Sequence, residues 1–141
     1  MTDHACKVAW MDNRAPQKLS LKESGNSMMT FGLATCTAVL VQKLDGVMLL
    51  YHLSAMCSLF KTVDCEDATC IYVKFAKNSY VKNADGIWKQ HCSKDVHEFL
   101  EHYIPLVDVK MKPYGFWGDY QEFPSQLGVQ IVEGEFVIVG M

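Results

Sequence analysis

The sequence lacks a strong excess of charge of either sign. Its 141 residues include 13 lysines and arginines against 16 aspartates and glutamates, which gives a formal net charge of -3. Proteins that bind nucleic acid or an anionic membrane surface generally carry a dense field of basic charge. The near balance of charge therefore argues against both of these partners.

Long hydrophobic runs are also missing, although 50% of the residues are hydrophobic. A membrane-spanning helix needs about 20 consecutive apolar residues, and no stretch approaches that length. The first ten residues, MTDHACKVAW, place polar and charged side chains where a secretory signal has its apolar core. We therefore expect a soluble protein made in the cytosol, with residues 1–141 forming one domain around a core of its own.

A regular set of metal ligands is lacking as well. Cys65 and Cys70 are separated by four residues, which is wider than the usual spacing of a zinc-binding pair, and His91 and Cys92 add no regular second pair. A zinc site built from these four residues is the weaker alternative, and we expect no metal and no cofactor. Because nothing indicates secretion, the six cysteines are expected to be thiols.

What the sequence does contain is a pair of apolar runs separated by a turn. Thr37–Val41 is short and rich in β-branched residues, and Val47–Leu53 is a second run of similar length. Asp45-Gly46 between them is a common turn dipeptide. The pattern predicts a β-hairpin.

The register of this hairpin decides which side chains share a face. If residues 44–46 form a three-residue loop with a left-handed glycine, Lys43 pairs with Val47. His52 then lies opposite Ala38, and Cys36 is its diagonal neighbour on the same face, with Cα atoms roughly 7–8 Å apart. A two-residue loop would instead place Cys36 and His52 on opposite faces.

The remainder of the chain reads mostly as strands, with two helices. The patterns predict a short helix from Ser54 to about Lys61 and an amphipathic helix over 94–103. Residues 1–27 are otherwise polar and irregular, 113–124 form an aromatic-rich loop, and 78–86 contain turns around a short strand. Further strands are expected at Lys7–Met11, Thr69–Ala76, 105–109, Val129–Val132 and Phe136–Val139. This order predicts an α+β fold, a layered, sandwich-like sheet core of hairpins packed with about two helices.

A cysteine–histidine site is the chemistry that the hairpin suggests. Cys36 follows a turn of small residues whose backbone N–H groups could hold an oxyanion, His52 could act as its base, and Thr30 could orient the imidazole. The competing interpretation is a buried structural cysteine and a surface histidine at a hairpin end. The residues of the proposed oxyanion turn are Gly32, Leu33, Ala34 and Thr35.

The string TFGLATCTAV, residues 30–39, resembles the motif T-x-G-L-G-S-C-x-A-V of the chemoreceptor glutamine deamidases (CheD). Thr30 lies six residues before Cys36, as that family's third catalytic residue does, and His52 ends a glycine-opened strand, GVMLLYH, as its catalytic histidine does. The cytotoxic necrotizing factor toxins share a related L-S-G-C turn and the same chemistry. A weaker similarity continues at 71–81, at 96–109 and in the terminal hairpin.

The resemblance implies a CheD- or necrotizing-factor-like fold and a protein-glutamine deamidase without a metal or cofactor. Cys36 would be the nucleophile, His52 its base and Thr30 the residue that orients the base. The substrate would be a protein that presents a glutamine. The enzyme would serve in bacterial signalling, or as a toxin-like effector delivered from a bacterium into a host cell. Two alternatives are a non-catalytic protein-binding module on the same fold and an amidase for small molecules.

Overall fold

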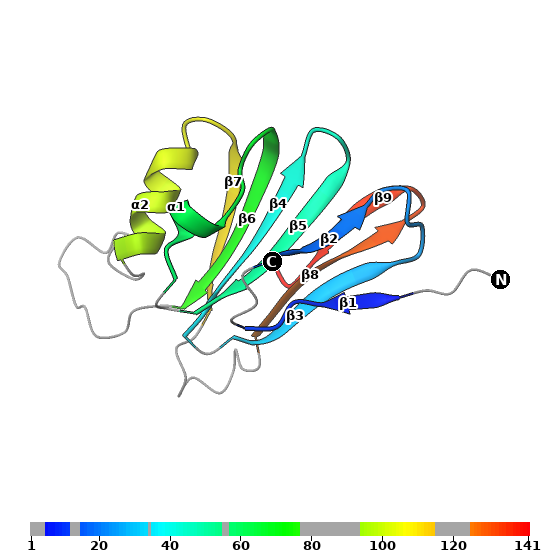
Figure 1. Cartoon of the computed structure of the whole chain (residues 1–141), viewed down its shortest axis with the longest axis horizontal. Helices are drawn as coiled ribbons and strands as arrows, with labels where there is room; N and C mark the ends of the chain where they lie inside the picture. The colour runs from blue at the N-terminus through cyan, green and yellow to red at the C-terminus, as the bar shows by residue number, and fades with distance from the viewer. Residues whose placement is uncertain (1–4, 12–14, 34, 55–56, 77–93, 115–124) are drawn as a thin grey trace.

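The computed structural model describes residues 5–11, 15–33, 35–54, 57–76, 94–114 and 125–141. These residues form an α+β fold of two sheets and two helices, as predicted (Figure 1). In chain order the elements are β1 (Cys6–Val8), β2 (Gln17–Ser20), β3 (Ser27–Leu33), β4 (Thr37–Lys43), β5 (Val47–Leu53), α1 (Leu59–Thr62), β6 (Ala68–Ala76), α2 (Lys94–Tyr103), β7 (Asp108–Tyr114), β8 (Ser125–Val132) and β9 (Glu135–Val139).

The elements lie in three layers. One sheet, sheet A, has the strand order β1-β3-β8-β9, and the other, sheet B, has the order β2-β5-β4-β6-β7. Helices α1 and α2 lie beside sheet B, on the side away from sheet A (Figure 1). Neither helix within the described ranges is long and apolar enough to cross a membrane.

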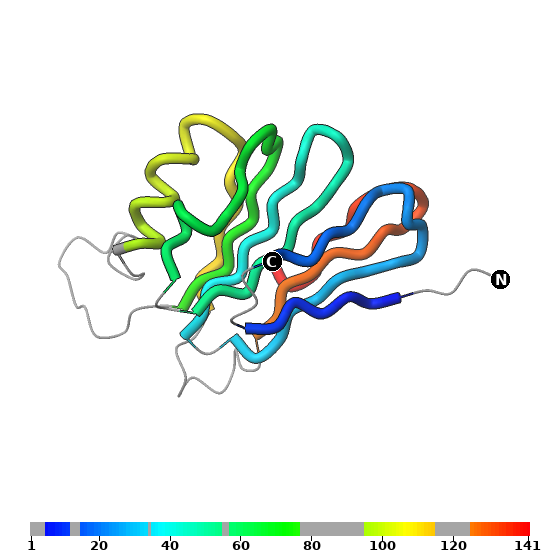
Figure 2. Tube along the Cα trace, viewed as in Figure 1, coloured from blue at the N-terminus to red at the C-terminus, as the bar shows by residue number. Residues whose placement is uncertain are grey.

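The β4–β5 hairpin has the predicted three-residue loop and the predicted register. Gly46 has a φ of 82°, and its N–H donates to the Lys43 carbonyl over 3.2 Å. Ala38 pairs with His52, and Leu40 pairs with Leu50. Figure 2 shows the two strands of this hairpin running side by side. The left-handed glycine thus fixes which face of sheet B each side chain occupies.

Alternation along these strands divides the apolar residues into two clusters, one on each face of sheet B. Val39, Leu49 and Tyr51 pack on the outer face with apolar residues of α1 and α2. Ala38, Leu40 and Leu50 face the other way and pack with β3 and β8 of sheet A. We call this second group, which lies between the two sheets, the inter-sheet cluster, and it also contains Cys36.

Two strands near the N-terminus were not predicted. Residues 17–20 were expected to be irregular and a turn was expected from Gly32, with no strand assigned before it, but residues 17–20 and 27–33 form β2 and β3. Only Leu19 of β2 is fully buried, so this edge strand has little apolar pattern. In β3, a register shift between Thr30 and Leu33 interrupts the pairing with β8. The predicted turn at 32–35 is therefore wrong in its first half, because the strand continues through Leu33.

The bounds of three other elements differ from their predictions. Helix α1 begins at Leu59 instead of Ser54. The N–H of Leu59 donates to Asp95 Oδ2 of α2 over 3.0 Å, and a contact with so distant a residue could not be predicted from the local sequence. Strand β1 ends at Val8 instead of continuing to Met11.

Strand β7 begins at Asp108 instead of 105, because the N–H groups of Leu106 and Val107 both donate to the Tyr103 carbonyl and prolong the end of α2. It tolerates Pro113 because it is an edge strand.

The other predicted elements that fall within the described residues are confirmed. Helix α2 has the predicted bounds, and β6 begins one residue early. The terminal hairpin turns at Glu133 and Gly134, with φ values of 51° and 77°. Its first strand is longer than predicted, starting at Ser125. The predicted turns and strand over 78–86, and residues 115–124 of the aromatic loop, lie outside the described residues.

Candidate active site

A buried polar pair joins the two sheets. Thr30 of β3 is fully buried and His52 of β5 is 5% exposed, and Thr30 Oγ1 lies 2.6 Å from His52 Nδ1. The same hydroxyl donates to the Ala9 carbonyl over 2.6 Å. A hydroxyl has one proton to donate, so Thr30 must accept at His52. His52 therefore carries its proton on Nδ1, which makes Nε2 the ring's acceptor nitrogen.

Cys36 lies immediately before β4, on the face of sheet B that His52 also occupies. Cys36 is 5% exposed and belongs to the inter-sheet cluster. Ala38, two residues further on, is the pairing partner of His52. Cys36 is thus the same-face diagonal neighbour of His52, the arrangement that the three-residue loop predicted. The structure brings all three residues of the predicted set, Thr30, Cys36 and His52, to one end of the inter-sheet layer.

A short segment after β1 contacts two of these three residues. The Ala9 N–H donates to the Met29 carbonyl over 3.0 Å, which extends the parallel pairing of β1 with β3. The Ala9 carbonyl then accepts the Thr30 hydroxyl, and Met11 Sδ lies 3.4 Å from Cys36 Sγ. Sequence reasoning gave this segment no role in the site.

Tyr114 is a second residue that sequence reasoning missed. Its hydroxyl donates to the Cys36 carbonyl over 2.7 Å, and Tyr114 as a whole is 1% exposed. Burial, and then the negative charge of a Cys36 thiolate, raise the pKa of Tyr114 well above its usual range, so the hydroxyl keeps its proton. Tyr114 was assigned to an aromatic loop, but it ends β7, opposite Ala76 of β6. Only the strand register reveals its contact with Cys36.

A buried lysine lies in the same strand row as His52. Ala38 pairs with His52 on one side and with Lys74 of β6 on the other. Lys74 Nζ donates to the carbonyls of Gln126 and Gly140, over 2.9 and 2.7 Å. A buried charge needs such partners, and these two carbonyls tie β6 of sheet B to the end of sheet A. The alternation of side chains along β6 is enough to predict that Lys74 points into the protein. Its two hydrogen-bond partners could not be predicted, because they are distant in the sequence.

The three described residues of the predicted oxyanion turn have different environments. Gly32 is exposed and has a φ of 67°, which suits a residue without a Cβ. Leu33 is fully buried in the inter-sheet cluster. Thr35 is exposed beside Cys36, and Ala34 lies outside the described residues. The role of their N–H groups stays a prediction.

The two cysteines of the alternative zinc site that the structure describes, Cys65 and Cys70, have different neighbours. Cys65 shares a hydrogen bond with Tyr103, whereas Cys70 Sγ lies 3.8 Å from Asp108 Oδ2. Burial raises the pKa of both thiols. In the part of the chain that the structure describes, no three histidine, cysteine or acidic side chains are placed to hold a metal ion. His91 and Cys92 lie outside that part.

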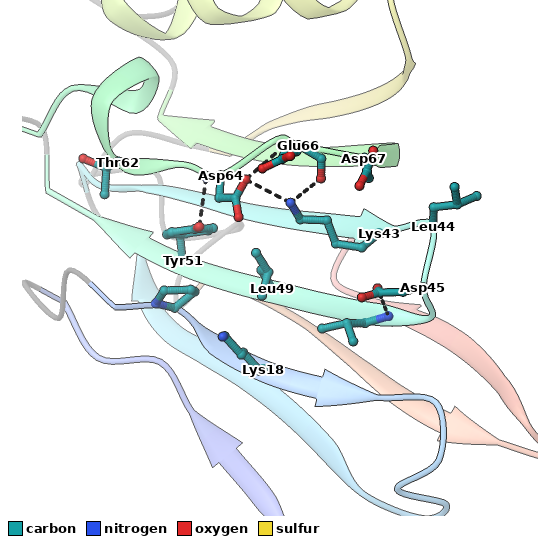
Figure 3. A pocket seen from close by; sticks show the side chains of 12 residues that line it. Lys18, Lys43, Leu44, Asp45, Leu49, Tyr51, Thr62, Asp64, Glu66 and Asp67 are labelled. Atoms are coloured by element: carbon teal, nitrogen blue, oxygen red, sulfur yellow. Dashed lines mark hydrogen bonds and ion pairs between the residues drawn. The ribbon is translucent and has the colours of Figure 1, made fainter.

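A pocket of about 700 Å³ lies on the outer face of sheet B (Figure 3). Cys36 belongs to the cluster on the opposite face. Its floor is formed by Val47, Leu49 and Tyr51 of β5, and Lys43 forms an ion pair with Asp64 over 3.0 Å. Lys43 also donates to the Glu66 carbonyl. We call this the outer pocket; its other lining residues are Pro16, Lys18, Leu44, Asp45, Thr62, Glu66 and Asp67.

Comparison with known proteins gives a distant structural likeness and no match in sequence. No family model and no curated protein matches the sequence. The C-terminal domain of CNFy from Yersinia pseudotuberculosis is similar over 96% of this chain and 54% of that chain, with 11% identity and a TM-score of 0.43. With values this low, fold and function rest on the residues of this chain. The resemblance of residues 30–39 to the CheD motif stays a prediction.

Proposed function

We propose that this protein is a cysteine-dependent amidase that acts on glutamine side chains of proteins. The observation that carries the proposal is the chain of hydrogen bonds from the Ala9 carbonyl through the Thr30 hydroxyl to His52 Nδ1. It sets the tautomer in which Nε2 can accept a proton, and it does so on the sheet face that holds Cys36. A histidine that merely packs in a core does not require this orientation.

In the proposed reaction His52 Nε2 takes the proton of the Cys36 thiol, and the thiolate attacks the carboxamide carbon of a glutamine. The tetrahedral oxyanion would be held by backbone N–H groups of the segment before Cys36, from the set Gly32, Leu33, Ala34 and Thr35. The protonated His52 then delivers its proton to the leaving nitrogen, ammonia departs, and a thioester remains. Water, activated by His52, hydrolyses the thioester to glutamate and restores the thiol.

The residues around the nucleophile support this reaction by holding it in place. The hydrogen bond of Tyr114 to the Cys36 carbonyl fixes the backbone that carries the sulfur. Thr30 would keep the imidazole in one orientation while its charge changes, because its hydroxyl is itself anchored to Ala9. In this proposal Cys36 and His52 are the catalytic residues, and Thr30 and Tyr114 are positioning residues.

The proposal extends to a protein substrate, by the resemblance of residues 30–39 to the deamidase motif. A bacterial signalling enzyme and an effector delivered into a host cell would use the same reaction. The proposed class therefore covers both, and the identity of the protein that is deamidated distinguishes them.

The test is deamidation in water enriched in heavy oxygen. The purified protein is incubated with bacterial and mammalian cell extracts, and mass spectrometry locates glutamates that acquired one heavy oxygen at a former glutamine. We expect label at specific sites with the wild type and with Cys6→Ala, whose cysteine is exposed, and none with Cys36→Ala. Labelling that persists in Cys36→Ala contradicts the proposal, and an absence of specific labelling in both extracts favours a protein-binding module.

A further inference from the structure

A buried lysine lies on the same sheet face as the nucleophile. Lys74 of β6 is 6% exposed, and Ala38 of β4 pairs with it on one side and with His52 of β5 on the other. Cys36 precedes Ala38 by two residues, so it is the same-face diagonal neighbour of both partners. Diagonal neighbours have Cα atoms roughly 7–8 Å apart. The proposed base and the lysine therefore flank Cys36 from the two strands on either side of β4.

The ammonium is held at the end of the inter-sheet layer where the oxyanion would form. Lys74 Nζ donates to the carbonyls of Gln126 and Gly140, over 2.9 and 2.7 Å. Gln126 follows Ser125, and Ser125 pairs with Leu33 of the proposed oxyanion segment. The positive charge is thus near both Cys36 and the segment whose N–H groups would hold the oxyanion.

The structural tie between the sheets does not by itself require a charge at Lys74. A neutral amide N–H can donate to a carbonyl as an ammonium does, and burying it costs less. Both acceptors of Lys74 are neutral carbonyl oxygens, so they hold the ammonium without cancelling its charge. Among apolar side chains a charge acts more strongly than in water, because the effective dielectric constant is lower. The charge is therefore the property of Lys74 that the tie leaves unexplained.

The other titratable groups around the nucleophile come from several elements. His52 of β5 is its proposed base, and Tyr114 of β7 keeps its proton. Lys7 of β1 is paired with a glutamate over 3.0 Å, and the buried side chains that β3 and β8 present to the layer carry no charge. Met141 follows β9 and bears a main-chain carboxylate. Because Met141 is only half-buried, water screens its charge more than that of the buried ammonium.

We propose that the Lys74 ammonium offsets the solvation that negative charge loses at Cys36, first on the thiolate and then on the tetrahedral oxyanion formed from it. The inference deepens the proposed amidase function, and its part on the oxyanion rests on that function. His52 transfers the proton, whereas Lys74 keeps its own proton and supplies a fixed positive charge. No bond forms or breaks at Lys74.

The test is the pH dependence of Cys36 alkylation by iodoacetamide, which needs no turnover. Lys74→Gln keeps hydrogen-bond donors and removes the charge, whereas Lys74→Arg keeps the charge. We expect Lys74→Gln to move the midpoint of Cys36 labelling upward by about one pH unit, as for the loss of a charge at this separation, and Lys74→Arg to leave it at the wild-type value. A midpoint that is unchanged in Lys74→Gln, or that moves equally in both variants, overturns the inference.

Lys112 provides a matched control in the same strand row. It pairs with Lys74 across β6 and β7, but it is exposed, so water and salt screen its charge. Lys112→Gln is therefore expected to leave the midpoint of Cys36 labelling unchanged. A shift in Lys112→Gln as large as that in Lys74→Gln would trace the effect to total charge and overturn the role of the buried ammonium.

A second measurement leaves Lys74 in place and remains decisive if Lys74→Gln does not fold. The side-chain nitrogen resonance of Lys74, assigned by its absence in Lys74→Arg, is followed by NMR across the same pH range. We expect the resonance to shift at the midpoint of Cys36 labelling in the wild type and to lack this step in Cys36→Ser, whose hydroxyl does not ionise in this range. A wild-type resonance without that step overturns the inference.

Failure of the inference and failure of the proposed function give different results. A shifted midpoint in Lys74→Gln, without specific heavy-oxygen labelling of glutamines by the wild type, supports the charge effect and contradicts the amidase. Specific heavy-oxygen labelling by the wild type, with an unchanged midpoint in Lys74→Gln, supports the amidase and overturns the role of Lys74. The absence of both overturns the two together.

Discussion

The two faces of the β4–β5 hairpin use polar groups in different ways. On the outer face, Lys43 and Asp64 form an ion pair in which the Asp64 side chain is 59% exposed, and the outer pocket is open beside them. On the inter-sheet face, Thr30 and His52 are both buried and joined by a 2.6 Å hydrogen bond. The hairpin supplies one residue to each arrangement, Lys43 from β4 and His52 from β5, and the partners Asp64 and Thr30 come from other parts of the chain.

The difference shows where the evidence for chemistry lies. An ion pair at the surface contributes little to stability and forms readily on any protein. The ion pair beside the outer pocket is therefore no sign of a functional site. A buried imidazole and hydroxyl cost solvation, which their mutual hydrogen bond offsets only in one geometry. That geometry sets the histidine tautomer beside a cysteine. Four substitutions test whether the two faces differ as proposed.

The largest effect is expected from His52→Ala. Removal of a general base typically costs about 100-fold to 10,000-fold in rate, so deamidation should fall at least by the lower value. Tyr51→Phe is the matched control, because Tyr51 adjoins His52 in β5 but faces the outer pocket, where its hydroxyl accepts the Asp64 N–H. Steady-state rates are compared after circular dichroism shows that both variants fold. Equal losses in the two variants would contradict the assignment of chemistry to the inter-sheet face.

Replacement of Thr30 should give the next largest effect. Thr30→Val keeps the shape of the side chain but leaves the Ala9 carbonyl and the His52 Nδ1–H without their shared partner, which costs about 2 kcal/mol of stability. The rate should fall as well, with a changed pH profile, because the imidazole tautomer is no longer fixed. Thr30→Ser restores the hydroxyl and should recover most of both. A normal rate and pH profile in Thr30→Val would show that the hydroxyl has no positioning role.

A smaller effect is expected from Tyr114→Phe. The variant loses the hydrogen bond to the Cys36 carbonyl, which should lower the free energy of unfolding by about 1 kcal/mol. Because the backbone at Cys36 is then less firmly held, kcat should fall while KM changes little. Denaturant unfolding and steady-state kinetics measure the two quantities. A fall in stability with an unchanged kcat would reduce Tyr114 to a structural residue.

The smallest effect belongs to the outer pocket. Lys43→Met removes an ion pair worth about 0.5 kcal/mol, in which only the Asp64 side chain is exposed, together with the hydrogen bond to the Glu66 carbonyl, and it should leave deamidation unchanged. The pKa of Asp64 is lowered by its hydrogen bond with the Glu66 backbone and then by Lys43. A lowered pKa stabilises the folded state above the unfolded value, and the contribution is lost as the pH falls through the folded value. The variant should therefore differ from the wild type near neutral pH and approach it in strong acid. A large loss of activity would move the chemistry to this face.

The sequence predicted the part of the site that depends on local pattern. Asp45-Gly46 predicts the loop, the loop sets the register, and the register places Cys36 and His52 on one face. Thr30 was named as the residue that could orient His52, and the motif over residues 30–39 supported that choice. Each of these steps needs only neighbouring residues or the alternation of one hairpin.

Contacts across long sequence separations could not be predicted in this way. Tyr114 reaches Cys36 across 78 residues, and Lys74 reaches Gly140 across 66. The Met11 contact depends on a parallel pairing of β1 with β3, and β3 itself was not predicted. Side-chain alternation shows that such residues point inward, but not which atoms they meet.

The most direct test of the central claim is the pH dependence of alkylation at each cysteine, measured with limiting iodoacetamide from about pH 5 to about pH 9 and read by mass spectrometry. The claim is that His52 activates Cys36. Cys70 is the internal reference, because burial raises its pKa. We predict that labelling of Cys36 reaches its plateau at lower pH than labelling of Cys70, and that His52→Ala removes this difference. Labelling of Cys36 that follows Cys70 in the wild type, or that is unaffected by His52→Ala, would contradict the account.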